Sequence, residues 1–209
     1  MRLREVPSTI FNISSLVELD VTYNKISGSI PEDICKQSAK LQFVSLVGNQ
    51  LQGEIPSALT RCQALQELYL FSNKLTGNIQ IDFCNLTMLQ ALVLARNLFT
   101  GTVPPSLGNF SSLRVIDLDD NSFLGKMPSE LGLLPSLIEC YLSFNKLKGE
   151  VPLSIFNISR LQILHLAGNE LFGNLPSSID KGLPTLEYRS LAVNQFSGSI
   201  PTQSQTSPS

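Results

Sequence analysis

Apolar residues recur along the chain at fixed distances from one asparagine, which returns every 24 or 25 residues. Leucine stands eight positions before this asparagine, leucine or valine stands three before it, and glycine stands four after it. Proline follows seven positions after it in seven of the eight copies, with Gln80 as the exception. A period of this length is typical of stacked repeats. The motif LxxLxLxxNxLxGxIPxxL therefore predicts eight coils, marked by Asn24, Asn49, Asn73, Asn97, Asn121, Asn145, Asn169 and Asn194.

Each part of the motif predicts a local conformation. The LxLxx segment, with apolar residues two apart, favours a short strand that buries one face. Coils of equal length stack these strands about 4.8 Å apart into one parallel sheet. The asparagine follows where the backbone turns inward, so we expect its amide to pair with main-chain groups of its own and the next coil. Each buried amide left unpaired would cost about 1–3 kcal/mol, so we expect all eight to be hydrogen-bonded. Stacked one above another, the eight asparagines would form a structural ladder along the solenoid.

Repetition also accounts for the length of the chain. Its 209 residues are many for one globular core and few for two domains. We expect a partial leading repeat at residues 1–15, eight repeats over residues 16–201 and a polar tail at residues 202–209.

The composition excludes several classes of protein. Hydrophobic residues make up 43% of the chain and charged residues 15%, with a formal net charge of -2. Nucleic-acid binding needs a concentrated basic surface, which this balance does not supply. The apolar content is too high for a disordered chain. No apolar run reaches the roughly 18–20 residues of a membrane span. No Cys/His grouping has zinc spacing, and we expect no cofactor or metal.

At these motifs the chain resembles the plant-type leucine-rich repeat family, whose signature is the Gly-x-Ile-Pro element after the asparagine. The similarity covers about residues 3–201, including segments such as NISSLVELDVTYNKISGSIPEDIC and SIFNISRLQILHLAGNELFGNLPSSIDKGLPTLE. These segments resemble the ectodomains of pattern-recognition leucine-rich repeat receptor-like kinases. The resemblance implies an α/β solenoid: a right-handed superhelix with one parallel concave sheet and short 3-10 or turn segments on the convex side.

The resemblance also implies a place for the chain in a larger protein. Complete members carry a signal peptide, capping segments, a transmembrane helix and a kinase domain, and none of these motifs occurs here. We expect the internal repeat array of a larger receptor, extracellular at the surface of a plant cell and joined to the membrane only through a helix elsewhere in the parent chain. The array itself is not expected to be an enzyme.

The outward positions of the predicted strands form the surface where ligands of such solenoids dock. Aromatic residues there are candidate contacts because aromatics dominate interface hot spots; the alternative is that the rings pack against one another between strands. Asp117, Asp119 and Asp120 crowd one coil, which favours a cationic partner or a solvated acidic patch without a ligand. An open sheet gives no enclosed pocket, which argues against a catalytic carboxylate pair with Glu139 and against a hydrolase built on Ser143 and His165. The candidate ligand-binding residues are Phe43, Tyr69, Phe71, Asp117, Asp119, Tyr141, His165 and Tyr188, with Phe144 as a further exposed ring.

Four N-x-S/T sequons share one repeat phase on the turn side, away from the strands, so glycans would leave the strand surface free. They begin at Asn12, Asn85, Asn109 and Asn157.

The cysteines allow one bridge between adjacent coils. Cys35, Cys62 and Cys84 lie on the turn side of successive coils, so a Cys35–Cys62 disulfide competes with Cys62–Cys84 and with free thiols. Cys140 replaces a core leucine and is expected to be a buried, unreactive thiol.

These features favour a non-enzymatic module that recognises a peptide or protein ligand and contacts a co-receptor ectodomain. One alternative is a soluble protein similar to polygalacturonase inhibitors, which share the coil. A second is an ice-binding leucine-rich repeat protein, against which the irregular exposed columns argue.

Overall fold

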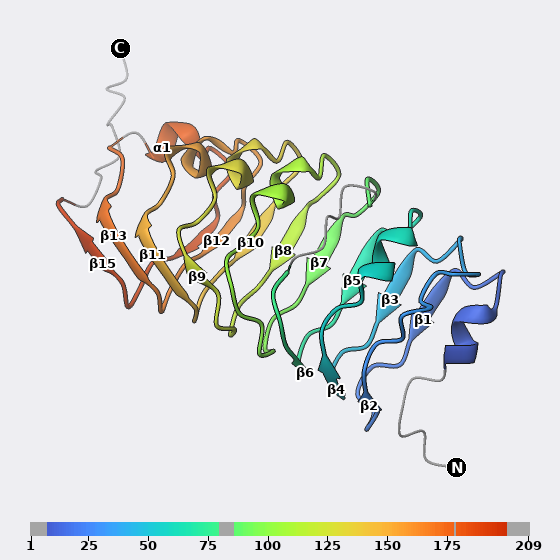
Figure 1. The fold of residues 1–209 in the computed structure, drawn as a ribbon. Coiled ribbons are helices and arrows are strands. Elements are labelled where there is room, and N and C mark those ends of the chain that lie inside the picture. The colour runs from blue at the N-terminus through green and yellow to red at the C-terminus, as the bar shows by residue number, and fades with distance from the viewer. Residues whose placement is uncertain (1–7, 80–85, 178, 200–209) are drawn as a thin grey trace.

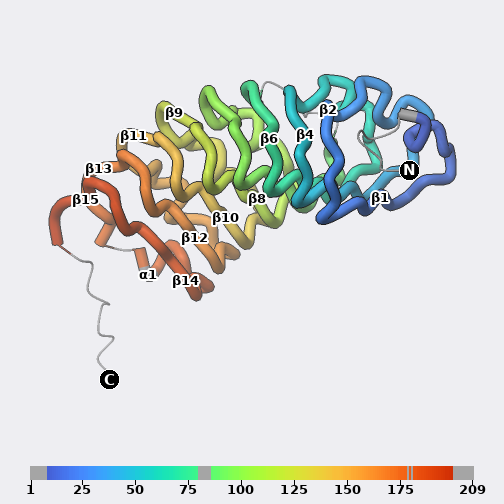
Figure 2. The backbone as a smooth tube through the Cα atoms, turned by 90° about the horizontal axis from the view of Figure 1, so that it is seen from below, coloured from blue at the N-terminus to red at the C-terminus, as the bar shows by residue number. Residues whose placement is uncertain are grey.

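The computed structural model describes residues 8–79, 86–177 and 179–199. Within them the chain forms stacked coils, each contributing one strand to a parallel eight-stranded sheet, in the order β1-β3-β5-β7-β8-β10-β12-β14. Figure 1 shows the coils side by side, and Figure 2 shows that the stack bends along its length. The strands are β1 (Glu18–Asp20), β3 (Phe43–Ser45), β5 (Glu67–Tyr69), β7 (Ala91–Val93), β8 (Val115–Asp117), β10 (Glu139–Tyr141), β12 (Ile163–His165) and β14 (Tyr188–Ser190).

Two shorter parallel sheets, which the sequence did not predict, run along the next segment of the coils. One contains β2 (Ser27–Gly28), β4 (Gln50–Gly53) and β6 (Lys74–Leu75). The other contains β9 (Leu124–Gly125), β11 (Lys146–Glu150), β13 (Glu170–Asn174) and β15 (Gln195–Ser197). They form because coils of nearly constant length keep this segment in register as well. The fold is thus an α/β solenoid whose main sheet is joined by a second row of strands.

On the opposite side of most of the described coils a short helical turn follows the proline. These turns are η1 (Ser8–Asn12), η2 (Ser57–Arg61), η4 (Pro105–Asn109), η5 (Ser129–Leu133), η6 (Leu153–Asn157) and the single α-helical turn α1 (Ile179–Gly182). The third residue after the proline, such as Leu107 or Leu131, is fully buried and pins the turn to the core.

The core is a single continuous column of aliphatic side chains. The middle residue of most strands is buried, whereas the first and third residues face outward, as the alternation of strand side chains requires. Phe99 and Phe123 occupy the same position in neighbouring coils and stack with ring centroids 6.2 Å apart. The high leucine content therefore follows from a core that is long and one coil wide.

The repeated asparagines link neighbouring coils through the backbone. The Asn97 side chain accepts a hydrogen bond from the backbone N–H of Leu75 at 3.0 Å and donates to the carbonyl oxygens of Leu70, Leu94 and Ala95. The same pattern recurs at Asn49, Asn73, Asn121, Asn145, Asn169 and Asn194, whereas the bonds of Asn24, in the first coil, go to the carbonyl oxygens of Val21 and Thr22 in its own coil. Besides its own coil, the Asn97 side chain thus contacts the preceding coil, whereas the sequence led us to expect the next one. The turn at the end of the strand points the amide toward the preceding coil.

The residue directly before each ladder asparagine has a positive φ. Glycine occupies this position only at Gly48 and Gly168; elsewhere ordinary side chains adopt the left-handed conformation, with φ of 51–58°. The chain reverses from strand to turn at this point, and the asparagine bonds hold the reversal in place. The strained residues are Tyr23, Ser72, Arg96, Asp120, Phe144 and Val193.

Candidate ligand-binding face

The outward surface of the eight-stranded sheet is made of three columns of side chains. Each coil contributes the first and third residues of its strand and the residue two positions before the ladder asparagine, and we call this surface the strand face. Over its 24 positions, all within the described residues, six are carboxylates and none is Lys or Arg. The six are Glu18, Asp20, Glu67, Asp117, Asp119 and Glu139. The strand face is therefore acidic, although the chain carries a net charge of only -2.

Aromatic side chains lie at the first part of the strand face. Phe43 and Tyr69 belong to paired strands, and their ring centroids are 5.6 Å apart. The guanidinium of Arg96 lies 5.3 Å from the centroid of Phe71, within the range of a cation–π contact. Arg96 also contacts the Asp120 carboxylate, with 3.4 Å between Nε and Oδ2. Arg96 thus borders the strand face and already has partners there.

The central part of the strand face is a cluster of carboxylates. The backbone N–H of Asp119 donates to Asp117 Oδ1 at 3.1 Å, and the backbone N–H of Ser143 in the next coil donates to Asp119 Oδ1. Partial burial, followed by the charge of Asp117, raises the pKa of Asp119 to about 7, although the Ser143 bond opposes this shift. Burial also raises the pKa of Asp117. These carboxylates are close together and short of cations, so a positively charged group would stabilise their ionised forms.

Two tyrosines are held by glutamates on their own strands. The hydroxyl of Tyr69 donates to Glu67 Oε2 at 2.7 Å, and that of Tyr141 donates to Glu139 Oε2 at 2.8 Å. Burial, strengthened by this bond, raises the pKa of Tyr69 to about 12, and the pKa of Tyr141 is raised for the same reasons. Because both hydroxyls are hydrogen-bonded to glutamates, the two tyrosine rings are held in place on the strand face, and their solvent-facing surface is available for contact with a ligand.

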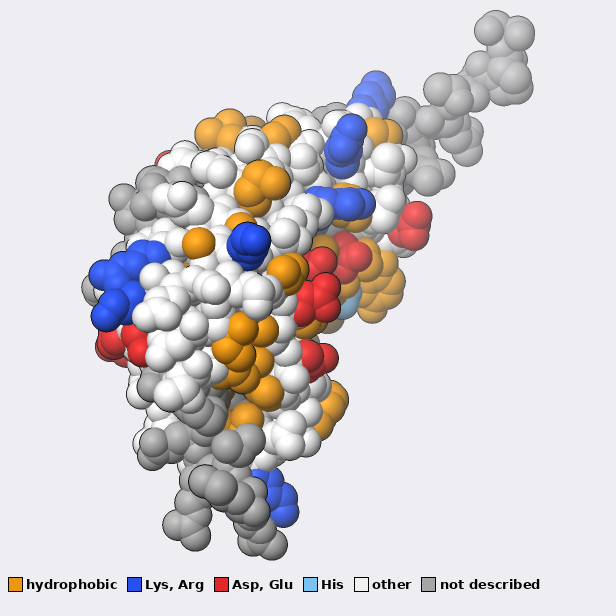
Figure 3. Space-filling model, turned by 90° about the vertical axis from the view of Figure 1, so that its right-hand side faces the viewer, with side chains coloured by type: hydrophobic (Ala, Val, Ile, Leu, Met, Phe, Trp, Pro, Cys, Tyr) orange, Lys and Arg blue, Asp and Glu red, His pale blue; other side chains and the backbone are white. Residues whose placement is uncertain are grey.

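The last part of the strand face is an aromatic cluster around the single histidine. His165 lies between Tyr141, edge-on with centroids 4.8 Å apart, and Tyr188, with centroids 4.9 Å apart. Burial lowers the pKa of His165, which favours the neutral ring. Figure 3 shows acidic side chains gathered next to the histidine, with hydrophobic side chains on either side. Phe144 lies at the edge of this region and is 58% exposed.

The structure thus places the eight predicted contact residues on one face but divides them into three groups. Phe43, Tyr69 and Phe71 form the first, Asp117 and Asp119 the second, and Tyr141, His165 and Tyr188 the third. Some rings do pack on one another, so the alternative weighed from the sequence describes part of the arrangement.

Sequence reasoning missed Arg96 and the role of Glu67. Arg96 could have been found from the opposite charge of Asp120, which stands at the same repeat position one coil later. Glu67 could have been found from its position two residues before Tyr69 on the same strand.

The chemistry that the strand face can perform is recognition. In the described residues no group of three His, Cys, Asp or Glu side chains is placed to hold a metal ion. The Ser143 hydroxyl is buried and makes no hydrogen bond, so it is not joined to His165 in the way a hydrolytic relay requires. The Glu139 carboxylate accepts the Tyr141 hydroxyl.

The turn side carries the sequons and the disulfide. Asn12, Asn109 and Asn157 are exposed at the ends of η1, η4 and η6, whereas Asn85 lies outside the described residues. Cys35 and Cys62 form a disulfide between adjacent coils, with 5.2 Å between their Cα atoms. Cys84 lies outside the described residues.

The remaining described cysteine is part of the core. Cys140 is fully buried, and burial raises the pKa of its thiol to about 12, so it is unreactive. None of the described helical turns has the length or apolar character to cross a membrane.

Comparison with known proteins identifies the repeat. The family described as Leucine Rich Repeat matches residues 15–37, 40–62, 64–86, 88–110, 112–134 and 160–181. No curated protein sequence matches the chain significantly.

Solved structures with the same fold are plant receptor ectodomains and related solenoids. The structure of PEPR1–AtPEP1 superposes with a TM-score of 0.86 at 39% identity, covering 94% of this chain and 28% of that one. The Arabidopsis receptor kinase HAESA, in complex with the peptide hormone IDA and the co-receptor SERK1, superposes with a TM-score of 0.89 at 34% identity, covering 94% and 33%. A plant ice-binding protein superposes with a TM-score of 0.80 at 29% identity, covering 94% and 63%. The chain spans about a third of the length of each of these two receptor chains.

Proposed function

The chain belongs to the leucine-rich repeat family, and on that premise we propose that its strand face captures a peptide or protein ligand as part of a receptor ectodomain. The observation that carries this proposal is the strand face itself, on which six carboxylates and a series of half-buried or exposed rings occur without a single Lys or Arg. A solenoid face with no ligand has no need to gather charges of one sign, because like charges destabilise the folded state.

The arrangement of the face indicates the kind of ligand. Asp117 and Asp119 lie between two aromatic groups, so an extended ligand crossing the coils would meet rings, then carboxylates, then rings. Aromatic side chains supply the contact area that dominates binding energy, and the carboxylates supply specificity for a positive charge. The ligand that fits is an extended peptide, or a protein segment, with a Lys or Arg flanked by apolar residues.

The receptor setting rests on the related structures. PEPR1 is solved with AtPEP1, and HAESA with the peptide hormone IDA and the co-receptor SERK1. By analogy, the present coils would form part of an extracellular, non-enzymatic ectodomain that brings a peptide to a co-receptor. The disulfide between Cys35 and Cys62 supports an oxidising compartment. The sequons at Asn12, Asn85, Asn109 and Asn157 would carry glycans there, and the three within the described residues lie on the side opposite the strand face.

The fold alone does not select this function, since a plant ice-binding protein shares it. Ice binding requires a flat and regular array, whereas the strand face mixes Glu, Phe, Tyr, Asp and His in an irregular order. The chemistry of the face therefore favours peptide recognition.

The test is a selection of random peptides displayed on phage against the folded, purified chain. Enrichment of peptides that carry Lys or Arg next to apolar residues, and that compete with one another for one site, is the expected result. Recovery of no specific peptide, or of predominantly acidic ones, would count against the proposal.

A further inference from the structure

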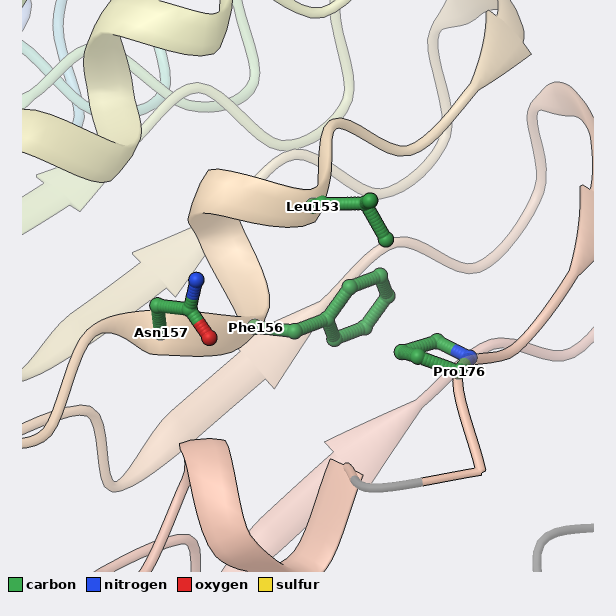
Figure 4. Close-up of a pocket in the computed structure, with 4 residues that line it drawn as sticks. All are labelled: Leu153, Phe156, Asn157 and Pro176. Atoms are coloured by element: carbon green, nitrogen blue, oxygen red, sulfur yellow. The ribbon is translucent and has the colours of Figure 1, made fainter.

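A pocket on the turn side is lined by one of the sequon asparagines. It has a volume of about 210 Å³ and is formed by Leu153, Phe156 and Asn157 of η6 together with Pro176 of the next coil. Figure 4 shows the Phe156 ring between Leu153 and Pro176, with the Asn157 amide beside the start of the Phe156 side chain. A space of this size is many times what one water molecule needs. One sugar residue fits such a space, whereas a drug-sized ligand does not.

The pocket lies beside a position that varies between coils. At the position of Phe156, the two preceding coils have Gly108 and Gly132. A Cβ on Gly108 would lie 2.4 Å from the carbonyl oxygen of Glu130, and one on Gly132 would lie 2.3 Å from the Cβ of Ser154. Glycine thus lets those turns pack directly on the next coil. At Phe156 the close approach is made from the other side, because a Cβ on Gly182 of the next coil would lie 1.9 Å from the Phe156 carbonyl oxygen. The pocket is the space left beside the Phe156 side chain.

The pocket surface is part polar and part apolar, and the side chains of Leu153 and Pro176 provide its apolar walls. Leu153 is 69% exposed, which leaves apolar surface that a ligand could remove from water. The ring of Phe156 is largely buried and forms the floor. Sugar rings present C–H groups on one face, and these suit an apolar wall and an aromatic ring with its negative face.

We propose that the first N-acetylglucosamine of a glycan on Asn157 is seated in this pocket. The inference rests on the proposed extracellular location, since the sequon is used only in the secretory pathway. In the transfer reaction, a bond forms between Asn157 Nδ2 and C1 of the sugar, the bond between C1 and the diphosphate of a lipid-linked donor breaks, and the amide loses one proton.

The local geometry allows the attached sugar to reach the pocket. The Asn157 side chain is exposed, and its terminal torsion is broad and roughly two-fold, so a half-turn places the nitrogen on the side of Phe156 where the oxygen now lies. On the facing helix α1, a Cβ on Gly182 would lie 3.1 Å from Asn157 Oδ1. The Phe156 carbonyl oxygen would lie closer still, at 1.9 Å, so glycine at that position first serves the backbone approach and also keeps a Cβ away from the asparagine amide.

The chain offers a matched control site. Asn109 ends η4 at the same repeat phase, but it follows Gly108 rather than a phenylalanine, and it lines no pocket among those described. Both sequons can be removed without changing the asparagine. The backbone carbonyls of Ser159 and Ser111 each accept a side-chain hydroxyl from the next coil, from Thr185 and Ser136, and these bonds survive Ser→Ala.

The experiment compares thermal unfolding of Ser159→Ala and Ser111→Ala with that of the unmodified sequence. All proteins are secreted by a eukaryotic host, trimmed enzymatically to one N-acetylglucosamine per site and checked for occupancy by mass spectrometry. We expect Ser159→Ala to lower the Tm by about 2 °C and Ser111→Ala to leave it within about 0.5 °C. In the Leu153→Ser background, Ser159→Ala is expected to have no effect, because the wall is gone.

Three results would overturn the inference: an unoccupied Asn157, equal Tm shifts at the two sites, or a Ser159→Ala shift that persists in Leu153→Ser. Binding of a phage-selected peptide to the same proteins separates this inference from the proposed function. The pocket and the strand face lie on opposite sides of the coil, so Ser159→Ala is expected to leave peptide affinity unchanged whether or not the sugar is seated.

Discussion

The Asn97 side chain accepts the backbone N–H of Leu75 at 3.0 Å while its own N–H groups reach the carbonyl oxygens of Leu70 and Leu94. One amide therefore satisfies backbone groups of two coils in a site that is 7% exposed. Backbone groups that face the core cannot be satisfied by water, so this side chain performs a task that no apolar residue can replace.

Asn97→Leu is accordingly expected to destabilise the chain by about 3–5 kcal/mol, since several buried polar groups lose their partners at about 1–3 kcal/mol each. Asn12→Gln, at an exposed turn position, is expected to change stability by less than about 0.5 kcal/mol. Urea unfolding of both variants checks this difference. Equal shifts of the two midpoints would contradict the ladder.

The left-handed residue before each ladder asparagine gives a second expectation. Val193 is β-branched, is 79% exposed and has a φ of 55°. Such a conformation costs about 1–2 kcal/mol, and glycine avoids it at an entropic cost of about 0.5–1 kcal/mol. Val193→Gly is therefore expected to raise the Tm by about 1–3 °C.

The equivalent site one coil earlier provides the opposite case. Gly168 has a φ of 66°, and a Cβ there would lie 2.7 Å from the Phe144 ring. Gly168→Val is expected to lower the Tm. A Val193→Gly variant that melts at or below the parent temperature would show that the reversal carries no strain.

The raised pKa of Asp119 predicts how stability depends on pH. In the folded chain the pKa is about 7, against 3.8 for the free side chain, so between these values the folded state binds more protons than the unfolded state. Stability therefore falls as pH rises from about 4 to 7. Asp119→Asn keeps an oxygen to accept the Ser143 N–H and removes the charge.

The variant should flatten this part of the pH profile. Discounted for solvent screening, the expected gain of Asp119→Asn over the parent at pH 8 is on the order of 1–2 kcal/mol, and it should disappear near pH 4. Denaturant unfolding across this range measures it. Parallel profiles for parent and variant would mean that Asp119 titrates as an ordinary surface carboxylate.

Much of the fold could be predicted from the sequence because the same residue types recur at the same positions of every coil. Leucine columns, the ladder asparagines and the turn prolines each have one role that a single coil already requires. The sequence limited the disulfide to two possible pairings, Cys35–Cys62 and Cys62–Cys84, but could not decide between them, since the three cysteines lie at comparable distances along the chain. The second row of strands and the left-handed residue before each asparagine depend on how one coil lies on the next, and no residue type marks them.

The sequence predicted which strand positions form the candidate site. It did not predict that the side chains there form three separate groups. Placing Phe43, Tyr69 and Tyr141 on one face needs only the alternation of a strand. That the hydroxyls of Tyr69 and Tyr141 are held by Glu67 and Glu139 depends on rotamers. The pocket beside Phe156 lies at a position that varies from coil to coil, so it depends on how neighbouring coils pack and could not be predicted from the sequence.

The central claim is that the strand face binds the ligand, and the affinity of a phage-selected peptide for paired variants tests it most directly. Asp119→Lys with Phe71→Ala alters two groups of the strand face. Glu170→Lys with Phe172→Ala makes the same chemical changes on β13, outside that face. Isothermal titration calorimetry on both, after circular dichroism has shown each to be folded, gives the comparison. We predict at least a tenfold loss of affinity, about 1.4 kcal/mol, for the first pair and no change for the second. Unchanged affinity in a folded Asp119→Lys, Phe71→Ala variant, or an equal loss in both pairs, would contradict the account.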